Sequence, residues 1–198
     1  MNFDLTDDQM MMRDMFAGFL DEHSSIGHVR AAMEKGGFDA ALWQGLGEQG
    51  ALAIRAPESA GGLGLGVFDA LLLMQEAGRT LVSGPLAEAL VAGRLLAEFG
   101  ASADLLAQAL SGEAVVTLAF EDVAEMPRQW IAGGAVAQAI IAKSGDDIVL
   151  VSVDESARQP SENLASTPMA QIDFASLDKV VLGSGADARA TFAAGIEE

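Results

Sequence analysis

The sequence predicts an α+β protein, in which an N-terminal all-α domain is followed by a small β-barrel-like domain and the start of a further helix. Three observations indicate this order. Apolar residues recur at helical spacing over residues 1–111, short β-branched runs occupy residues 112–184, and a helical pattern returns over residues 185–198. Of the 198 residues, 51% are hydrophobic, which is enough to build a core.

The predicted helical domain begins with an amphipathic helix from Leu5 to about His23. Thr6 and Gln9 have the T-x-x-Q spacing of a capping box. Further helices are expected over residues 25–34, 39–50, 68–81, 86–99 and 102–110, separated by glycine-containing breaks. Asp39 and Ser102 stand where side chains cap helix N-termini.

Residues 56–66, A-P-E-S-A-G-G-L-G-L-G, predict a turn region between two apolar helical blocks. Pro57 fixes its own φ angle, and the glycines permit positive φ and close approach of the backbone. A nucleotide-binding loop is excluded, because Gly62, Gly64 and Val67 do not fit G-x-G-x-x-G and no Lys-Ser/Thr pair follows. The stretch is therefore interpreted as a connector.

The β-rich part contains five candidate strands, over residues 114–120, 136–142, 148–153, 169–174 and 179–182. Gly145 and the two aspartates after it predict a turn, so the second and third candidates form a hairpin. Asp187 is expected to cap a new helix, and the sequence ends within that pattern. We therefore expect residues 185–198 to begin a further helical domain, and Glu197 and Glu198 to be exposed.

Composition and charge exclude several classes of function. The formal net charge of −18 opposes binding to nucleic acids and to anionic membranes, which both require basic side chains. The chain has no cysteine, and its two histidines are five positions apart, so we expect no disulfide, no thiol chemistry and no metal site. The acidic N-terminus and the absence of an apolar run of about 18 residues predict a soluble, cytoplasmic protein.

Two groups of residues resemble one known family. The first comprises residues 5–9 (L-T-D-D-Q), 42–50 (L-W-Q-G-L-G-E-Q-G), 56–58 (A-P-E), 61–64 (G-G-L-G) and 76–79 (E-A-G-R). The second is residues 130–137 (W-I-A-G-G-A-V-A). Together they resemble the acyl-CoA dehydrogenase family, in which an N-terminal helical domain, a middle β-domain and a C-terminal helical domain follow one another.

The resemblance implies FAD-dependent α,β-dehydrogenation of an acyl-CoA thioester. In that chemistry a carboxylate removes the α-proton, hydrogen-bond donors stabilise the charge that develops on the thioester oxygen, and the flavin accepts hydride from the β-carbon. It also implies an acyl-CoA substrate and homo- or hetero-oligomers with acyl-CoA dehydrogenase-like chains. The family's usual base is a glutamate in the C-terminal domain, so no catalytic residue is assigned in this sequence.

By resemblance, the flavin-facing and thioester-facing residues are Phe120, Glu121, Trp130, Ile131 and Ala132. Ordinary strand packing is the alternative for each of them. The family's Thr-Glu-Pro-x-x-Gly-Ser loop is reduced here to A-F-E-D-V-A at residues 119–124, and the step to Trp130 is short. Ala132 replaces a Thr or Ser whose hydroxyl bonds the flavin in the family.

Three functional hypotheses remain open. The chain is part of an acyl-CoA dehydrogenase-like flavoprotein that is incomplete by itself, or it is a degenerate, non-catalytic partner subunit of such a complex. The third hypothesis, an acidic helical interaction module, accounts for the composition but not for the ordered motifs from residue 5 to residue 64.

Overall fold

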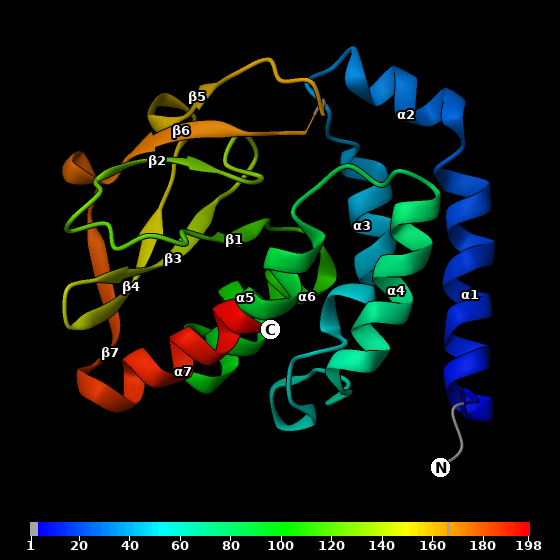
Figure 1. Ribbon diagram of the computed structural model, residues 1–198, viewed down its shortest axis with the longest axis horizontal. Helices are drawn as coiled ribbons and strands as arrows, with labels where there is room; N and C mark the ends of the chain where they lie inside the picture. The colour runs from blue at the N-terminus through cyan, green and yellow to red at the C-terminus, as the bar shows by residue number, and fades with distance from the viewer. Residues whose placement is uncertain (1–3, 166) are drawn as a thin grey trace.

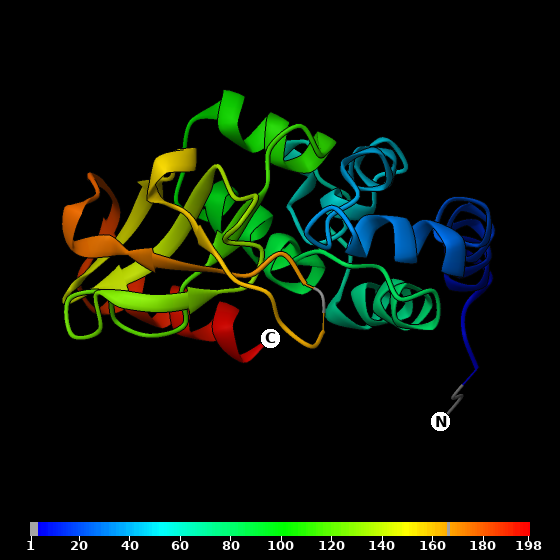
Figure 2. The same ribbon diagram turned by 90° about the horizontal axis from the view of Figure 1, so that it is seen from above.

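The computed structural model describes residues 4–165 and 167–198, and residues 1–3 and 166 lie outside this description. A group of helices and a two-sheet β-domain lie side by side, and the last helix, α7, runs along the edge of the β-domain (Figure 1, Figure 2). The helical elements are α1 Asp7–His23, α2 Ile26–Met33, α3 Ala40–Glu48, η1 Ala51–Ala53, η2 Glu58–Ala60, α4 Val67–Arg79, α5 Leu86–Glu98, α6 Ala103–Ser111 and α7 Gly185–Glu197. The predicted α+β fold class is confirmed.

Side-chain caps set the starts of two helices as predicted. The Thr6 hydroxyl accepts a hydrogen bond from the Gln9 N–H at 3.2 Å, and the Gln9 side chain accepts one from the Thr6 N–H at 3.1 Å. This is the complete capping box at the start of α1. Asp39 accepts from the N–H groups of Ala41 and Leu42 at the start of α3.

Ser102 is the N-cap residue of α6, as predicted, but its side chain makes no capping hydrogen bond. The predicted cap at Asp187 was wrong. The N-cap of α7 is Ser184, and Asp187 lies inside the first turn, where the positive end of the helix dipole favours an acidic side chain. The Ser184 hydroxyl donates instead to Asp147 at 2.6 Å, which ties the start of α7 to the β-domain.

The helical domain is organised around a core to which α1, α3, α4 and α5 all contribute. Phe16 of α1, Leu46 of α3 and Leu73 of α4 are each at most 1% exposed. The buried members of this core are Phe16, Leu20, Leu42, Trp43, Leu46, Ala51, Leu52, Ile54, Ala70, Leu73, Ala77, Leu86, Ala89, Leu90 and Val115. The apolar faces predicted from helical spacing therefore point inward.

The connector at residues 56–66 folds back on the chain that precedes it. The Leu63 N–H donates to the Ala53 carbonyl at 2.9 Å, and the Gly64 N–H donates to the Ala56 carbonyl at 2.8 Å. Gly62 is required by space, because a Cβ atom there would lie 2.0 Å from the Ala56 oxygen. Gly62 therefore allows the connector backbone to approach the backbone of Ala56 closely within the helical domain.

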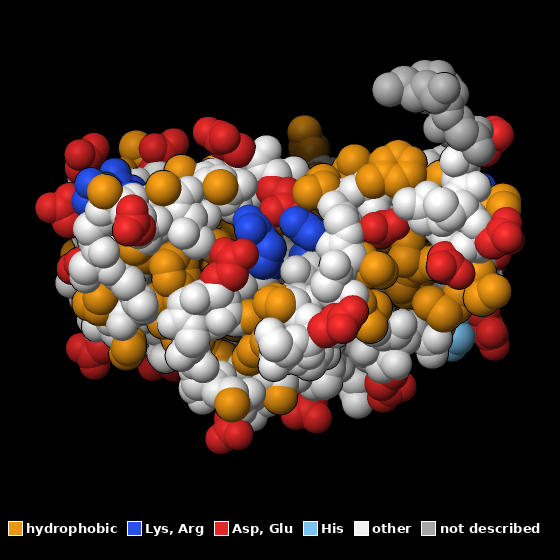
Figure 3. All heavy atoms as spheres, turned by 90° about the horizontal axis from the view of Figure 1, so that it is seen from below, with side chains coloured by type: hydrophobic (Ala, Val, Ile, Leu, Met, Phe, Trp, Pro, Cys, Tyr) orange, Lys and Arg blue, Asp and Glu red, His pale blue; other side chains and the backbone are white. Residues whose placement is uncertain are grey.

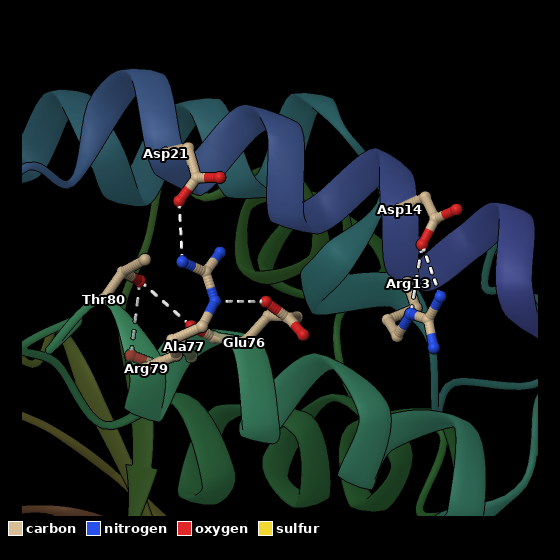
Figure 4. Close-up of polar contacts among 7 residues, drawn as sticks. All are labelled: Arg13, Asp14, Asp21, Glu76, Ala77, Arg79 and Thr80. Carbon is tan, nitrogen blue, oxygen red and sulfur yellow. Dashed lines mark hydrogen bonds and ion pairs between the residues drawn. The ribbon is translucent and has the colours of Figure 1, made fainter.

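The E-A-G-R motif at residues 76–79 joins α4 to α1 (Figure 4). Arg79 Nε lies 2.7 Å from Glu76 Oε2, and Arg79 Nη1 lies 2.7 Å from Asp21 Oδ1 of α1. These bonds, to Asp21 and then to Glu76, raise the pKa of Arg79 above its ordinary value. Because Glu76 is only 8% exposed, Arg79 supplies the opposite charge that its burial requires.

The β-domain consists of two sheets. The first has the order β1-β3-β4-β7 and the second the order β2-β6-β5; only β1 and β3 pair in parallel. The strands are β1 Val116–Leu118, β2 Arg128–Ile131, β3 Ala139–Ser144, β4 Asp147–Ser152, β5 Gln159–Pro160, β6 Ala170–Asp173 and β7 Lys179–Ser184. The predicted hairpin is confirmed as β3–β4.

Some predicted strands are shorter or shifted. The run at 114–120 forms a strand only over β1, and the strand expected at 136–142 begins at Ala139. The strand of the W-I-A-G-G-A-V-A motif ends at Ile131. The chain turns there because Gly133 has a positive φ of 70° and its carbonyl accepts from the N–H of Val136.

The first sheet packs against an apolar core on each face, while Val180 and Val181 of its edge strand β7 are exposed. Between the two sheets lies a core that includes Ile131, Ile140 and Phe174, each at most 1% exposed. On the other face, Val116 and Leu118 of β1 share a core with α5, α6 and α7. This second core joins the helical domain to the β-domain.

Asp122 closes the loop that follows β1. Its carboxylate accepts hydrogen bonds from the N–H groups of Ala124 at 2.9 Å and Gly145 at 3.0 Å, and Lys143 lies 3.1 Å away. Burial favours the neutral acid, but these hydrogen bonds and the charge of Lys143 outweigh it and hold the pKa of Asp122 below its ordinary value. The loop is thereby attached to the β3–β4 turn.

We expect Gly62→Ala to lower the free energy of unfolding by about 2–3 kcal/mol, because the added methyl group collides with backbone that cannot move aside. Gly78→Ala is the matched control, since a Cβ at Gly78 in α4 meets nothing within 4 Å. We expect that control to stabilise by about 0.5–1 kcal/mol. Chemical denaturation measures both, and equal effects would contradict the role given to Gly62.

We expect Asp122→Asn to lower stability at neutral pH by about 1 kcal/mol through loss of charge-assisted hydrogen bonds. Because the folded-state pKa is lowered, the carboxylate contributes fully above its unfolded pKa of about 3.9, and the contribution disappears as pH falls through the folded-state pKa. Wild type and variant should therefore converge in acid. Denaturation between neutrality and acid pH measures this. Asp146→Asn in the adjacent turn, where the side chain is 87% exposed, should have a smaller effect.

Candidate functional site

An apolar groove lies where the helical domain meets the β-domain, and we call it the α4–α5–α7 groove. One part has a volume of about 170 Å³ and is lined by Ala87, Glu88, Val91, Leu118, Phe120, Gly195, Ile196 and Glu198. The other has a volume of about 90 Å³ and is lined by Arg55, Val67, Ala70, Leu71, Met74, Ala87, Leu90, Val91 and Glu198. The two parts share Ala87, Val91 and Glu198, so they form one continuous surface.

Helical spacing places the groove's lining. Ala87 and Val91 are four positions apart on α5, and their small side chains leave the space open. Val67, Leu71 and Met74 of α4 are four and three positions apart, so they share one face of the facing helix. Leu71 is 55% exposed and Val67 is 39% exposed. Exposed apolar side chains gathered in a hollow are typical of a surface that binds an apolar group.

A buried glutamine positions one end of the groove. Gln129 of β2 is 6% exposed, and its amide nitrogen donates to the carbonyls of Glu121 at 3.0 Å and Met126 at 2.8 Å. Its amide oxygen accepts from the Glu121 N–H at 3.3 Å. Gln129 therefore holds the loop after β1 against β2, and Phe120, directly before this anchor, lines the groove.

The structure distributes the five sequence-predicted site residues over different surroundings. Phe120 lines the groove and is 53% exposed, and Glu121 is exposed beside it. Trp130 is 54% exposed on β2, where it pairs with β6. Ile131 is 1% exposed in the core between the sheets, so strand packing accounts for its side chain. Ala132 stands in the turn after β2, and its carbonyl accepts from the Thr117 hydroxyl at 2.8 Å.

Sequence reasoning missed two arginines that pair with the groove residue Glu198: Arg55 lines the groove, and Arg94 lines neither of its parts. Arg55 forms an ion pair with Glu198 and also donates to the Leu65 carbonyl. Arg94 Nη2 lies 2.9 Å from Glu198 Oε2, and Arg94 Nη1 lies 3.1 Å from Glu98 Oε1. The one signal for Arg55 is its place as the only charged residue in the apolar run 51–56.

Glu197 and Glu198 are exposed as whole residues, as expected, but the Glu198 side chain is largely covered. That side chain is 12% exposed, because Arg55 and Arg94 hold both carboxylate oxygens against the helical domain. Figure 3 shows the corresponding pattern on the lower face, where basic side chains gather near the centre between hydrophobic side chains on either side. The end of α7 is thus fixed by charge as well as by apolar packing.

The residues of this chain fit a flavin only in part. Phe120 and Trp130 offer exposed aromatic surface for stacking. Ala132 has no hydroxyl, and the Thr117 hydroxyl and the Gln129 amide nitrogen donate to backbone carbonyls, so these three side chains offer a flavin no donor. The role of the five residues at a flavin stays a prediction.

The fold and the groove define a class of protein: a helical domain and a two-sheet domain that enclose an apolar site at their junction. The sequence matches the acyl-CoA dehydrogenase N-terminal domain over residues 6–113. The chain belongs to the acyl-CoA dehydrogenase family, and the family resemblance of the sequence is confirmed.

Three known proteins are similar to this chain, one in sequence and two in solved structure. It is 30% identical over 165 residues to the acyl-CoA dehydrogenase IpdE2 of Mycolicibacterium smegmatis, a match that covers 82% of this chain and 50% of that protein. A solved structure of the Tcur3481-Tcur3483 steroid ACAD G363A variant has a TM-score of 0.78 at 22% identity, covering 96% of this chain and 60% of that one. The ChsE4-ChsE5 complex from Mycobacterium tuberculosis has a TM-score of 0.74 at 24% identity, with the same coverage.

The chain thus spans about half the length of the curated relatives it matches. The two solved structures support the fold. Across the residues that the structure describes, no helix is both long enough and apolar enough to cross a bilayer.

We expect Gln129→Leu to loosen the loop after β1, because three hydrogen bonds to its backbone are lost while the buried volume is kept. The free energy of unfolding should fall by about 1–3 kcal/mol. Hydrogen exchange should also accelerate at the Glu121 amide, which now donates to Gln129. Gln171→Leu on the neighbouring strand is the control; if both variants exchange alike at Glu121, Gln129 does not anchor the loop.

Proposed function

We propose that this chain is part of an acyl-CoA dehydrogenase, in which the α4–α5–α7 groove receives the acyl group of an acyl-CoA. FAD-dependent α,β-dehydrogenation of that thioester is the activity proposed for the complete assembly. The observation that carries the proposal is the position of an apolar groove at the domain junction of a chain that belongs to this family. Its lining from Phe120 to Leu71 removes apolar ligand surface from water, which favours binding.

Each part of the groove has a separate task in this proposal. Ala87 and Val91 form a floor of small side chains that leaves room for the acyl group. Phe120, held by the Gln129 anchor, covers one end and excludes water there. The ion pairs of Glu198 with Arg55 and Arg94 hold the end of α7 as the opposite wall.

A second candidate is the role of a partner subunit in a mixed assembly with an acyl-CoA dehydrogenase-like chain that holds the flavin. The missing hydroxyl at Ala132 and the short link from Glu121 to β2 favour this candidate. Two of the solved structures with this fold carry paired names, Tcur3481-Tcur3483 and ChsE4-ChsE5. In both candidates the protein is an oligomer and the groove keeps its role.

We expect Ala87→Phe to weaken acyl-CoA binding by about tenfold or more, because a phenyl group on the shared floor fills both parts of the groove. Titration calorimetry with a medium-chain acyl-CoA measures the dissociation constant. Ala107→Phe on α6 is the matched control, since Ala107 is exposed and lies outside the groove. Unchanged binding in Ala87→Phe, with normal binding in the control, would contradict the proposed acyl site.

Flavin binding distinguishes the two candidate functions. We expect the protein to co-purify with a second acyl-CoA dehydrogenase-like chain when both are expressed together, and the flavin absorbance to follow the complex. A flavin spectrum from this chain alone, with Trp130 fluorescence quenched on addition of FAD, would instead support the first candidate without a partner. The measurements are the absorbance spectrum and the mass of the purified species.

A further inference from the structure

One carboxylate in the α4–α5–α7 groove has no partner. Glu88 of α5 lines the part of the groove that has a volume of about 170 Å³, and the residue is partly buried. Across the part of the chain that the structure describes, its side chain forms no hydrogen bond and no ion pair. A ligand that fills this part of the groove would remove water from the carboxylate, which is costly unless the ligand donates a hydrogen bond to it.

The start of α5 explains why Glu88 has no local donor. The helix begins at Leu86, so Glu88 is its third residue, and Pro85 is the N-cap. A glutamate at this position of a helix often accepts a hydrogen bond from the N-cap N–H, but proline has no N–H. The positive end of the helix dipole favours a negative charge in this first turn. Glu88 is therefore held at the groove with its acceptor sites open.

The other side chains of this part of the groove do not supply the missing donor. Apart from Glu198, they are hydrocarbon side chains and one glycine: Ala87, Val91, Leu118, Phe120, Gly195 and Ile196. Glu198 already has Arg55 and Arg94 at its two carboxylate oxygens. The part therefore presents an apolar surface with one open carboxylate.

The number of donors that this surface satisfies indicates the chemical group that fits. An ammonium group has three N–H donors, and those not taken by Glu88 would be left among hydrocarbon side chains, which is costly. A ketone oxygen offers lone pairs alone, and these would face the lone pairs of the carboxylate. A hydroxyl group has one donor, which Glu88 accepts. The hydroxyl is therefore the group that the groove satisfies best.

We propose that the acyl group bound in the α4–α5–α7 groove carries a hydroxyl group, and that this hydroxyl donates a hydrogen bond to the carboxylate of Glu88. The inference rests on the proposed function, because it takes the groove as the acyl site. It narrows the substrate class to hydroxylated acyl-CoA thioesters and makes Glu88 the residue that selects them. A plain hydrocarbon would cover the carboxylate without satisfying it, which disfavours its binding.

The first test compares thioesters of one size by titration calorimetry with the purified protein: cyclohexylpropanoyl-CoA and its ring-hydroxyl, ring-fluoro and ring-ammonium analogues, each as its positional isomers. We expect one isomer of the ring alcohol to bind about tenfold more tightly than the hydrocarbon, as one hydrogen bond to a charged acceptor allows. Equal binding of the hydrocarbon and every alcohol isomer overturns this inference but leaves the acyl site intact. Failure of all compounds to bind overturns the proposed function itself, and tightest binding of an ammonium compound overturns the choice of a hydroxyl.

The fluoro analogue separates hydrogen-bond donation from size and polarity, and it needs no variant of the protein. Fluorine is close to a hydroxyl group in size but carries no donor, and it turns the negative end of its bond dipole toward the carboxylate. We expect each fluoro isomer to bind no more tightly than the hydrocarbon. A fluoro isomer that binds as tightly as the matching alcohol would show that donation to Glu88 is not the cause, and would overturn the inference.

Glu88→Met should weaken binding of the alcohol by about tenfold while the hydrocarbon binds at least as tightly as before, because no carboxylate then loses water. A merely structural role of Glu88 would weaken both ligands alike. Asp104→Asn is the matched control, since Asp104 is an exposed acid in the first turn of α6 and lines neither part of the groove. It should keep the preference for the alcohol. A preference that survives in Glu88→Met, or that both variants lose equally, overturns the role of Glu88.

Discussion

The burial of β1 against α5 is the constraint on which the rest of the molecule depends. Val116 and Leu118 are 1% and 2% exposed, and they pack with Leu95 and Leu96 of α5, which are fully buried. On the opposite side, β1 pairs with β3 and brings the two-sheet domain with it. A three-residue strand thereby joins both domains, and the apolar area that it helps to remove from water stabilises their relative position.

The groove follows from this packing. Once β1 lies on α5, the residue that leaves the strand toward solvent, Phe120, stands beside the small side chains of α5. The end of α7 completes the wall, and its position is set by Phe192 in the shared core and by the contacts of Glu198 with two arginines. Ion pairs of low exposure stabilise only when their partners are well placed, so this arrangement favours one position of α7 over others.

The loop after β1 is a short connection whose shape is held by hydrogen bonds from polar side chains to backbone groups. Between Glu121 and Arg128 the chain makes one compact turn, fixed by Asp122 on one side and Gln129 on the other. Both polar side chains hold backbone groups, and the aromatic side chain of Phe120 stays exposed beside them.

Local sequence patterns were sufficient to predict the α-helices and the α+β class, and the ordered motifs were sufficient to indicate the family. Caps such as Thr6 and breaks such as Gly36 and Gly37 act within a few residues, so their signals are contained in the sequence near them. The end of β2 at Ile131 and the length of β1 were not predictable in this way, because pairing with distant strands decides them. Arg55, Arg94 and Glu198 are separated by 39 or more positions, and only the packing of α5 on the connector and on α7 brings their charges together around one groove.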